Sequence, residues 1–175
     1  MPPGPVIGYF GTISHWIDFE LVAEVAKACP GWQFVFIGPV SHAPGFEELT
    51  EAGNIHWIKE QPYTRLPEFS HCFDAAWLPF QADGLRASIN PVKIYEYLAA
   101  GKPVVATPLP DLVDLEPGVN IADSASDFIR RISALLDAQD ETMVKERRSI
   151  AERHSWDRLW REAEQRPVEN IAWGR

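Results

Sequence analysis

Short apolar segments alternate with segments of helical period along most of this chain. The apolar segments span only four to six residues and are bounded by Gly, Pro or polar residues. Short apolar strands separated by helices are typical of a parallel sheet covered on both faces. The sequence therefore predicts an α/β fold: a single Rossmann-like domain with a parallel sheet of about six strands and helices on both faces. The expected strands are residues 6–10, 32–37, 54–58, 73–78, 102–107 and 119–122, and the expected helices are residues 19–28, 62–70, 90–100, 126–136, 141–153 and a last helix capped by Ser155.

Length and composition narrow the class of protein. The 175 residues suffice for one domain with its own core, and 46% hydrophobic residues with seven Trp exclude a disordered chain. We expect a linker-like start at residues 1–5, a ligand-binding domain at residues 6–166 and a tail at residues 167–175. The formal net charge of −9 argues against a nucleic-acid partner.

The sequence lacks the features of membrane and secreted proteins. It contains no apolar run of membrane-spanning length and opens with no signal peptide. Cys29 and Cys72 are too few for a disulfide scaffold or a zinc site. These features predict a cytoplasmic protein with reduced cysteines.

The segment from Asn90 to Gly101 carries the strongest functional signal. Asn90 suits the N-cap, Pro91 the first helical position, and Gly101 the left-handed position just after the helix. A helix start at the carboxyl end of a buried strand offers free N–H groups to an anion such as phosphate. Glu96 follows Pro91 by five residues, roughly 7–8 Å along the axis, which is about the distance from a diphosphate to its ribose. The segment therefore resembles half of a nucleotide-diphosphate site.

A purely structural interpretation of this helix stays open. Capping alone explains Asn90, Pro91 and Gly101, and Lys93 could pair with Glu96 on the helix surface. The core-facing stripe would then comprise Val92, Tyr95, Leu98 and Ala99. This interpretation does not explain why the helix begins where a buried strand ends.

The other candidate binding residues lie in loops at the expected carboxyl edge of the sheet. Gly11, which precedes Thr12, could form a tight turn or allow a ligand to approach closely. Arg86 could make a forked contact with a diphosphate, and Ser88 could donate to a phosphate or sugar oxygen. Tyr63 could flank a base or a phosphate, although half-buried packing is its simpler interpretation.

Several familiar sites are absent from the sequence. The histidines show no metal-ligand spacing, and neither a nucleophile elbow nor a Walker loop occurs. We therefore expect no metal and no cofactor. On the last helix, Trp156, Leu159 and Trp160 form an apolar face that we expect to pack on the core of this domain, or else to remain for another domain.

Residues in five parts of the chain carry a family resemblance. The closest match is the segment Tyr95–Thr107, supported by residues 7–11, 32–38, 73–80 and 154–156. Together they resemble the C-terminal, donor-binding domain of a GT-B glycosyltransferase of the glycosyl transferases group 1, or family 4, type. The resemblance covers nearly the whole chain.

The resemblance implies roles for particular residues. Glu96 corresponds to the second glutamate of the family's Glu-x7-Glu motif and would bind ribose, whereas Ser88 stands where the first glutamate faces the donor sugar. Backbone N–H groups near Pro91, Val92 and Lys93 would hold the phosphates. The family's base-contact loop would fall at residues 61–63. The first loop, residues 11–18, lacks the family's usual Arg and Lys pair, so Arg86 or Lys93 would have to supply the cation.

The resemblance also implies an activity and its partners. It implies a hexosyl-type transferase of polysaccharide or glycoconjugate biosynthesis, which binds a nucleotide-diphosphate sugar for retaining, metal-independent transfer to a saccharide or lipid-linked acceptor. The acceptor domain would lie in an N-terminal half absent from this chain, through which the enzyme could contact the inner face of the membrane. The donor half alone is then expected to be inactive.

Two alternatives remain. One is a regulatory or scaffold module that binds nucleotides but has lost donor chemistry, as Ser88 and the first loop without a cation would suggest. The other is a different doubly wound protein, such as a flavodoxin-like phosphate binder.

Overall fold

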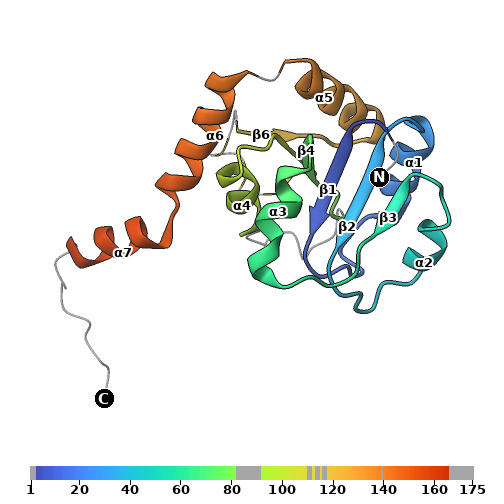
Figure 1. The fold of residues 1–175 in the computed structure, drawn as a ribbon, viewed down its shortest axis with the longest axis horizontal. Helices are drawn as coiled ribbons and strands as arrows, with labels where there is room; N and C mark the ends of the chain where they lie inside the picture. The colour runs from blue at the N-terminus through green and yellow to red at the C-terminus, as the bar shows by residue number, and fades with distance from the viewer. Residues whose placement is uncertain are drawn as a thin grey trace.

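A computed structural model describes residues 3–81, 92–109, 112, 115, 118–138 and 140–165 of the chain. Within these residues the strands form one sheet of six parallel strands in the order β3-β2-β1-β4-β5-β6 (Figure 1). The strands are β1 (Val6–Phe10), β2 (Gln33–Ile37), β3 (Ile55–Trp57), β4 (Ala75–Leu78), β5 (Val104–Ala106) and β6 (Val119–Ile121). The parallel α/β architecture expected from the sequence is confirmed.

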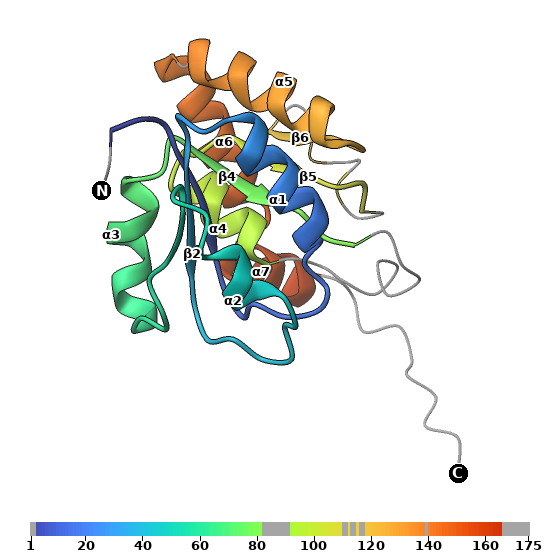
Figure 2. The same ribbon diagram turned by 90° about the vertical axis from the view of Figure 1, so that its right-hand side faces the viewer.

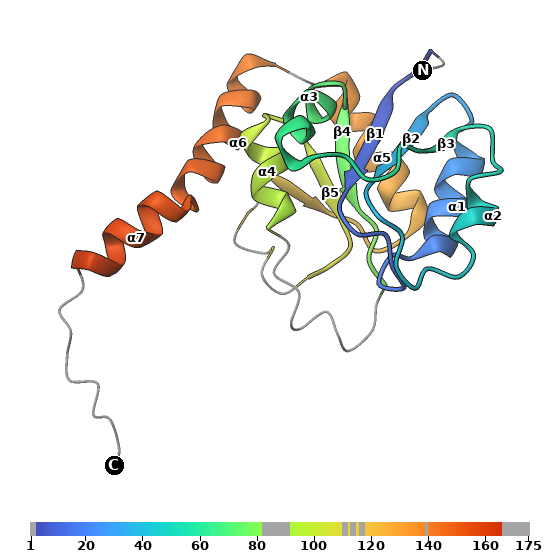
Figure 3. The same cartoon turned by 60° about the horizontal axis from the view of Figure 1, so that its bottom comes forward.

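Helices cover both faces of the sheet. Figure 2 shows α1 and α5 on one side of the strands and α3 on the other, beside α4. Helix α6 packs on the outer side of α4, and α7 extends away from the sheet (Figure 3). The helices are α1 (Phe19–Ala28), α2 (Phe46–Leu49), the short 3-10 helix η1 (Tyr63–Arg65), α3 (Leu66–His71), α4 (Lys93–Ala99), α5 (Ala125–Asp137), α6 (Glu141–Arg153) and α7 (Trp156–Gln165).

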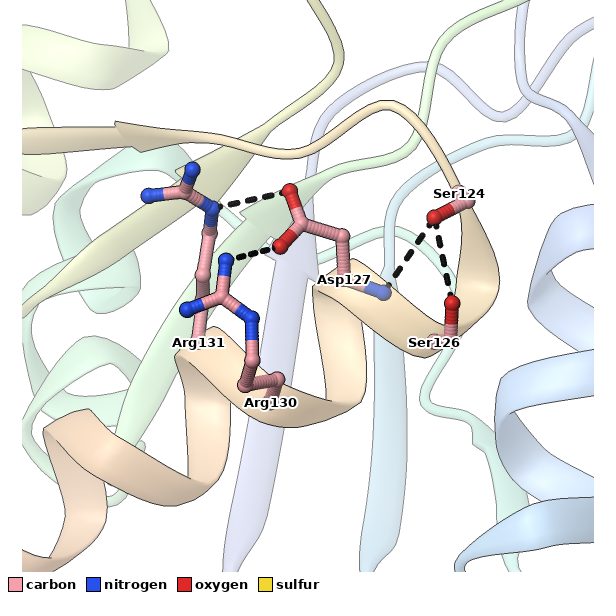
Figure 4. A network of polar contacts seen from close by, with 5 residues as sticks. All are labelled: Ser124, Ser126, Asp127, Arg130 and Arg131. Atoms are coloured by element: carbon pink, nitrogen blue, oxygen red, sulfur yellow. Dashed lines mark hydrogen bonds and ion pairs between the residues drawn. The ribbon is translucent and has the colours of Figure 1, made fainter.

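Capping side chains explain where several helices begin. Asp18 accepts a hydrogen bond from Leu21 N–H at 2.9 Å and starts α1, and Asp140 does the same for α6 through Met143 N–H. At α5, Ser124 accepts from the Asp127 N–H at 3.3 Å (Figure 4). Helices α1 and α6 consequently keep the bounds expected from the sequence.

Asp127 adds a charge network to the start of α5. Its carboxylate accepts hydrogen bonds from Arg131 and Arg130, one turn further along the helix (Figure 4). These contacts, with the hydrogen bond to Arg131 first, lower the pKa of Asp127. A negative side chain in the first turn also complements the helix dipole.

The helix expected over residues 62–70 is divided in two. The turn η1 precedes α3, and Pro67 lies in the first turn of α3, where a missing N–H costs little. Ser70 is buried in this helix and donates to Leu66 O at 2.8 Å. Leu66 and Phe69, the residues expected to face inward, are partly buried against the core.

The core-facing stripe expected for α4 is right for Leu98 and wrong for Val92 and Ala99. The buried residues are Ile94, Tyr97 and Leu98, whereas Val92 and Ala99 are exposed. The Tyr97 hydroxyl, which accepts a 2.8 Å hydrogen bond from Phe10 N–H, fixes this rotation because it must face the end of β1. Tyr95 is only partly buried and stacks on His154, with ring centroids 4.9 Å apart.

The two ends of α4 compare differently with the ends expected from the sequence. Gly101 has φ +76° just after the helix, which confirms its expected C-terminal role. At the other end, Val92 precedes the helix without a side-chain cap. The predicted cap Asn90 and the following Pro91 lie outside the described residues.

The two tryptophans of the expected apolar face on α7 do not pack on the core of this domain. Trp156 and Trp160 are 79% and 68% exposed, so the expectation of core packing is wrong for both. The side chain of Leu159 is not among those described.

The Tyr97 hydrogen bond provides a test of the fold. We expect Tyr97→Phe to lower the free energy of unfolding by about 1–3 kcal/mol, because it leaves the Phe10 N–H buried without its partner. Urea denaturation measures this change. Tyr63→Phe is the control, since the Tyr63 side chain is largely exposed and should shift stability by less than about 0.5 kcal/mol. Equal unfolding midpoints for the two variants would contradict this role of Tyr97.

Candidate functional site

The candidate residues of β1 and α4 meet at the carboxyl edge of the sheet. Ligands of open parallel sheets bind outside this edge, where loops rather than strands provide the contacts. The ring of Tyr97 lies 4.5 Å from that of Phe10, which brings α4 against the end of β1. Lys93 of α4 is thereby held close to the loop that begins at Gly11, and Glu96 follows one turn further along the helix.

Lys93 crosses from α4 to this loop. Its ammonium lies 6.0 Å from the centroid of the Tyr9 ring, close to the backbone of Gly11. A Cβ on Gly11 would meet Lys93 Cε at 1.9 Å and Nζ at 2.7 Å. Gly11 also has φ +129°, which a side chain would strain. Gly11 therefore permits the close approach of the Lys93 side chain, and the approach of a ligand to Gly11 stays a prediction.

The surroundings of Lys93 make it a poorly solvated cation. Among the described residues, the ion pairs within 4.0 Å do not include it. Burial lowers the pKa of the Lys93 ammonium, and the Glu96 carboxylate partly opposes this by its charge. A partly desolvated ammonium without a close carboxylate is a favourable place for an anion to bind.

Tyr9 and Thr12 support the floor of this loop. The Tyr9 hydroxyl donates to Thr12 O at 2.9 Å, and burial raises the pKa of Tyr9. Thr12 is thus held beside Gly11, where the sequence placed it as a candidate.

Glu96 is bound by a residue from a distant part of the chain. The Tyr63 hydroxyl donates to Glu96 Oε1 at 2.6 Å, although the two residues are 33 positions apart. Because Tyr63 is 71% exposed, the expectation of half-buried packing is wrong. The expected surface pair between Lys93 and Glu96 is also absent from the ion pairs of the described chain.

A cavity of about 370 Å³ adjoins Glu96 and Tyr63. It lies where α3, α4 and α6 meet, and its walls are mostly apolar. The wall residues include Phe10, Leu66, Pro67, Ala99, Ala100 and Arg148. No local sequence pattern predicts this cavity, because its walls come from helices far apart in the sequence, which the strand order brings together.

Four predicted site residues lie outside the described part of the chain. These are Arg86, Ser88, Asn90 and Pro91. Their roles, and that of the backbone N–H groups near Pro91, stay predictions. Val92, the next predicted residue, is 55% exposed.

The described residues contain neither a candidate metal site nor a candidate membrane span. No group of three or more His, Cys, Asp or Glu side chains that could hold a metal ion occurs in the described ranges. No described helix has the length and apolar character needed to cross a membrane.

Comparison with known proteins gives a family for the chain. Residues 4–138 match the family described as "Glycosyl transferases group 1". The chain is 32% identical over 166 residues to TuaH of Bacillus subtilis (strain 168), whose name assigns it to teichuronic acid biosynthesis as a glycosyltransferase. The match covers 91% of this chain and 42% of TuaH, so the chain spans less than half the length of this relative.

Solved structures share the fold over most of the chain. Sucrose-phosphate synthase from Thermosynechococcus elongatus superposes with a TM-score of 0.72 at 17% identity, over 93% of this chain and 44% of that protein. HepE of Anabaena, in complex with UDP-glucose, superposes with a TM-score of 0.69 at 16% identity, over 92% of this chain and 47% of HepE. The family resemblance seen in the sequence is confirmed. The chain belongs to the glycosyl transferases group 1 family, and its Rossmann-like domain corresponds to about half of a GT-B glycosyltransferase.

Proposed function

We propose that this domain binds the nucleotide-diphosphate sugar for retaining, metal-independent transfer of a hexosyl group to a saccharide or lipid-linked acceptor. The observation that carries the proposal is the pair of opposite charges on α4, held one turn apart at the carboxyl edge of the sheet. Lys93 presents a cation beside Gly11, and Glu96 presents a carboxylate beside Tyr63. The match to TuaH, together with HepE structures that contain UDP and UDP-glucose, supports a nucleotide sugar as the ligand.

Lys93 would stabilise the departing diphosphate. Breaking the bond between sugar and diphosphate increases the negative charge on the leaving oxygen, and a fixed cation nearby lowers the barrier. The loop of residues 11–18 contains no Lys or Arg. Lys93 reaches that loop from α4, so a cation is available there although the loop itself supplies none.

Glu96 would bind the ribose of the same nucleotide. A carboxylate accepts up to about four hydrogen bonds, and the hydroxyl of Tyr63 uses one position on Oε1. The remaining positions can accept both ribose hydroxyls. Because Glu96 and Lys93 are on one short helix, the spacing between the ribose and diphosphate contacts would be fixed by backbone geometry.

The acceptor site belongs to the other half of the protein in this proposal. Relatives such as TuaH have more than twice the length matched here, which leaves room for a second domain. We expect the donor half to bind nucleotides and the complete protein to transfer the sugar. The acceptor class, a cell-surface polysaccharide or its lipid-linked precursor, follows the assignment of TuaH.

Binding of nucleoside diphosphates tests the role of Glu96. We expect Glu96→Gln to weaken binding of UDP, or of whichever of UDP, GDP and ADP binds best, by about 10- to 100-fold, because hydrogen bonds to a charged group contribute about 1.5–3 kcal/mol. Isothermal titration calorimetry measures the change. Glu24→Gln, an exposed carboxylate of α1, is the matched control and should bind like the parent. Unchanged affinity in Glu96→Gln would contradict the ribose role.

Removal of the cation tests the role of Lys93. We expect Lys93→Met to weaken UDP binding about tenfold or more but to leave uridine binding nearly unchanged, because only UDP carries the charge that Lys93 attracts. The salt dependence of UDP binding should also decrease. Lys145→Met, on the exposed side of α6, is the control. An equal loss for uridine and UDP would mean that Lys93 supports the fold and not the diphosphate.

Turnover by the complete protein distinguishes an enzyme from a module without donor chemistry. We expect the chain rejoined to its N-terminal half to transfer or hydrolyse its nucleotide sugar in the presence of EDTA, with retention at the anomeric carbon by NMR. If Lys93 stabilises the charge that develops on the departing diphosphate, Lys93→Met should lower kcat. Tight nucleotide binding without turnover would favour the regulatory or scaffold alternative.

A further inference from the structure

The hydrogen bond between Tyr63 and Glu96 joins two separate elements that line the cavity. The hydroxyl of Tyr63, on η1, lies 2.6 Å from Oε1 of Glu96, on α4. A short hydrogen bond to an ionised carboxylate is among the stronger polar contacts in proteins. The hydrogen bond to Glu96 is also the main reason why the pKa of Tyr63 is raised, so the hydroxyl keeps its proton.

The exposure of Tyr63 argues that this contact serves the site more than the fold. A tyrosine that is 71% exposed buries little apolar surface, and an exposed hydrogen bond adds little to stability. A contact of this kind can nevertheless restrict where a flexible side chain points. Glu96 loses rotamer freedom before any ligand arrives.

The turn that presents Tyr63 is itself anchored. Pro62 precedes η1 with φ −54°, and the Arg65 guanidinium contacts Glu68 Oε2 at 3.3 Å and Gln61 Oε1 at 3.4 Å. The same guanidinium lies 5.3 Å from the centroid of the Phe69 ring. The hydroxyl of Tyr63 therefore acts from a fixed base.

Tyr63 also helps to keep Lys93 and Glu96, the two charges of α4, from pairing with each other. Lys and Glu three positions apart on a helix normally attract each other into a surface pair. Here the described ion pairs do not include Lys93 with Glu96, because Lys93 extends to Gly11 while Glu96 is held by Tyr63. Each charge thus stays available to a ligand.

We propose that Tyr63 is a positioning residue for ribose recognition, which holds Glu96 Oε1 and keeps this carboxylate apart from Lys93. This proposal rests on the function proposed above. Oε2 and the second lone pair of Oε1 are left for the two ribose hydroxyls. Without the phenol hydroxyl, Glu96 moves among rotamers and approaches Lys93, which weakens recognition of the ribose.

The test compares two ligands on five proteins. The ligands are UDP, or the nucleoside diphosphate that binds the parent best, and its 2′,3′-dideoxy analogue, which lacks both ribose hydroxyls. The proteins are the parent chain, Tyr63→Phe, Glu96→Gln, the double variant and the control Glu24→Gln, an exposed position on α1 that is expected to match the parent. Calorimetry gives each dissociation constant, and circular dichroism checks that each variant is folded.

The expected result is a loss that depends on the ribose hydroxyls. We expect Tyr63→Phe to weaken binding of the diphosphate about three- to tenfold, the range for one hydrogen bond, and to leave the dideoxy analogue unchanged. The double variant should bind no more weakly than Glu96→Gln alone, because Tyr63 acts through Glu96.

Other outcomes overturn the proposal. Tighter binding by Tyr63→Phe would make the hydroxyl a competitor of ribose, and an equal loss for both ligands would place the Tyr63 ring against the base instead. Unchanged binding in Tyr63→Phe, with a loss in Glu96→Gln, would overturn the role of Tyr63 alone. If the parent binds no nucleoside diphosphate, or Glu96→Gln binds like the parent, the proposed function fails as well.

Discussion

The hydrogen bond from Phe10 N–H to the Tyr97 hydroxyl fixes the arrangement on which the site depends. It joins the last residue of β1 to the buried face of α4, and the two rings pack 4.5 Å apart. Tyr97 is fully buried, and burial raises its pKa, so the hydroxyl remains neutral between two hydrophobic layers. Breaking this contact would leave a buried N–H without a partner, which makes the rotation of α4 costly to change.

The rotation of α4 decides where its charges go. With Ile94, Tyr97 and Leu98 against the sheet, Lys93 lies toward β1 and Glu96 toward η1. The two side chains therefore leave the helix toward different elements. A rotation of one residue, as the expected stripe with Val92 and Ala99 implied, would not give this separation.

The strands and helices could be predicted from the sequence because each is marked by a local pattern of apolar residues. Strand β1 is an uninterrupted apolar run, and its expected bounds were confirmed, as were those of α1 with its capping Asp18. The site depends on contacts between distant residues, and these require the strand order. The neighbouring position of β1 and β4 in the sheet, with α3 and α4 on one face, brings Tyr63 within 2.6 Å of Glu96. No local sequence pattern predicts this contact.

Aromatic residues gave the least reliable expectations for a physical reason. Tyr and Trp combine a large apolar ring with a polar group, so composition alone favours burial. Tyr63 is exposed because its hydroxyl has a charged partner at the surface, and Trp160 is exposed with its indole N–H donating to Glu164 at 2.9 Å. Tyr97, by contrast, is buried because a backbone N–H partner lies inside. Whether such a side chain is exposed or buried depends on where its polar partner lies, and only the tertiary structure gives that location.

The position of Lys93 changes how the missing loop cation is interpreted. In the sequence, a first loop without Lys or Arg suggested a loss of donor chemistry. Because Gly11 has no side chain, Lys93 can reach the loop. The glycine in the loop and the cation on α4 therefore depend on each other. The charge is then carried by the same helix as Glu96, the carboxylate proposed to bind ribose, and Tyr63 connects that helix to the turn after β3. A nucleotide that bridges these elements would meet groups that the fold already holds in place, which are the two charges of α4 and, through Glu96, the hydroxyl of Tyr63 on η1.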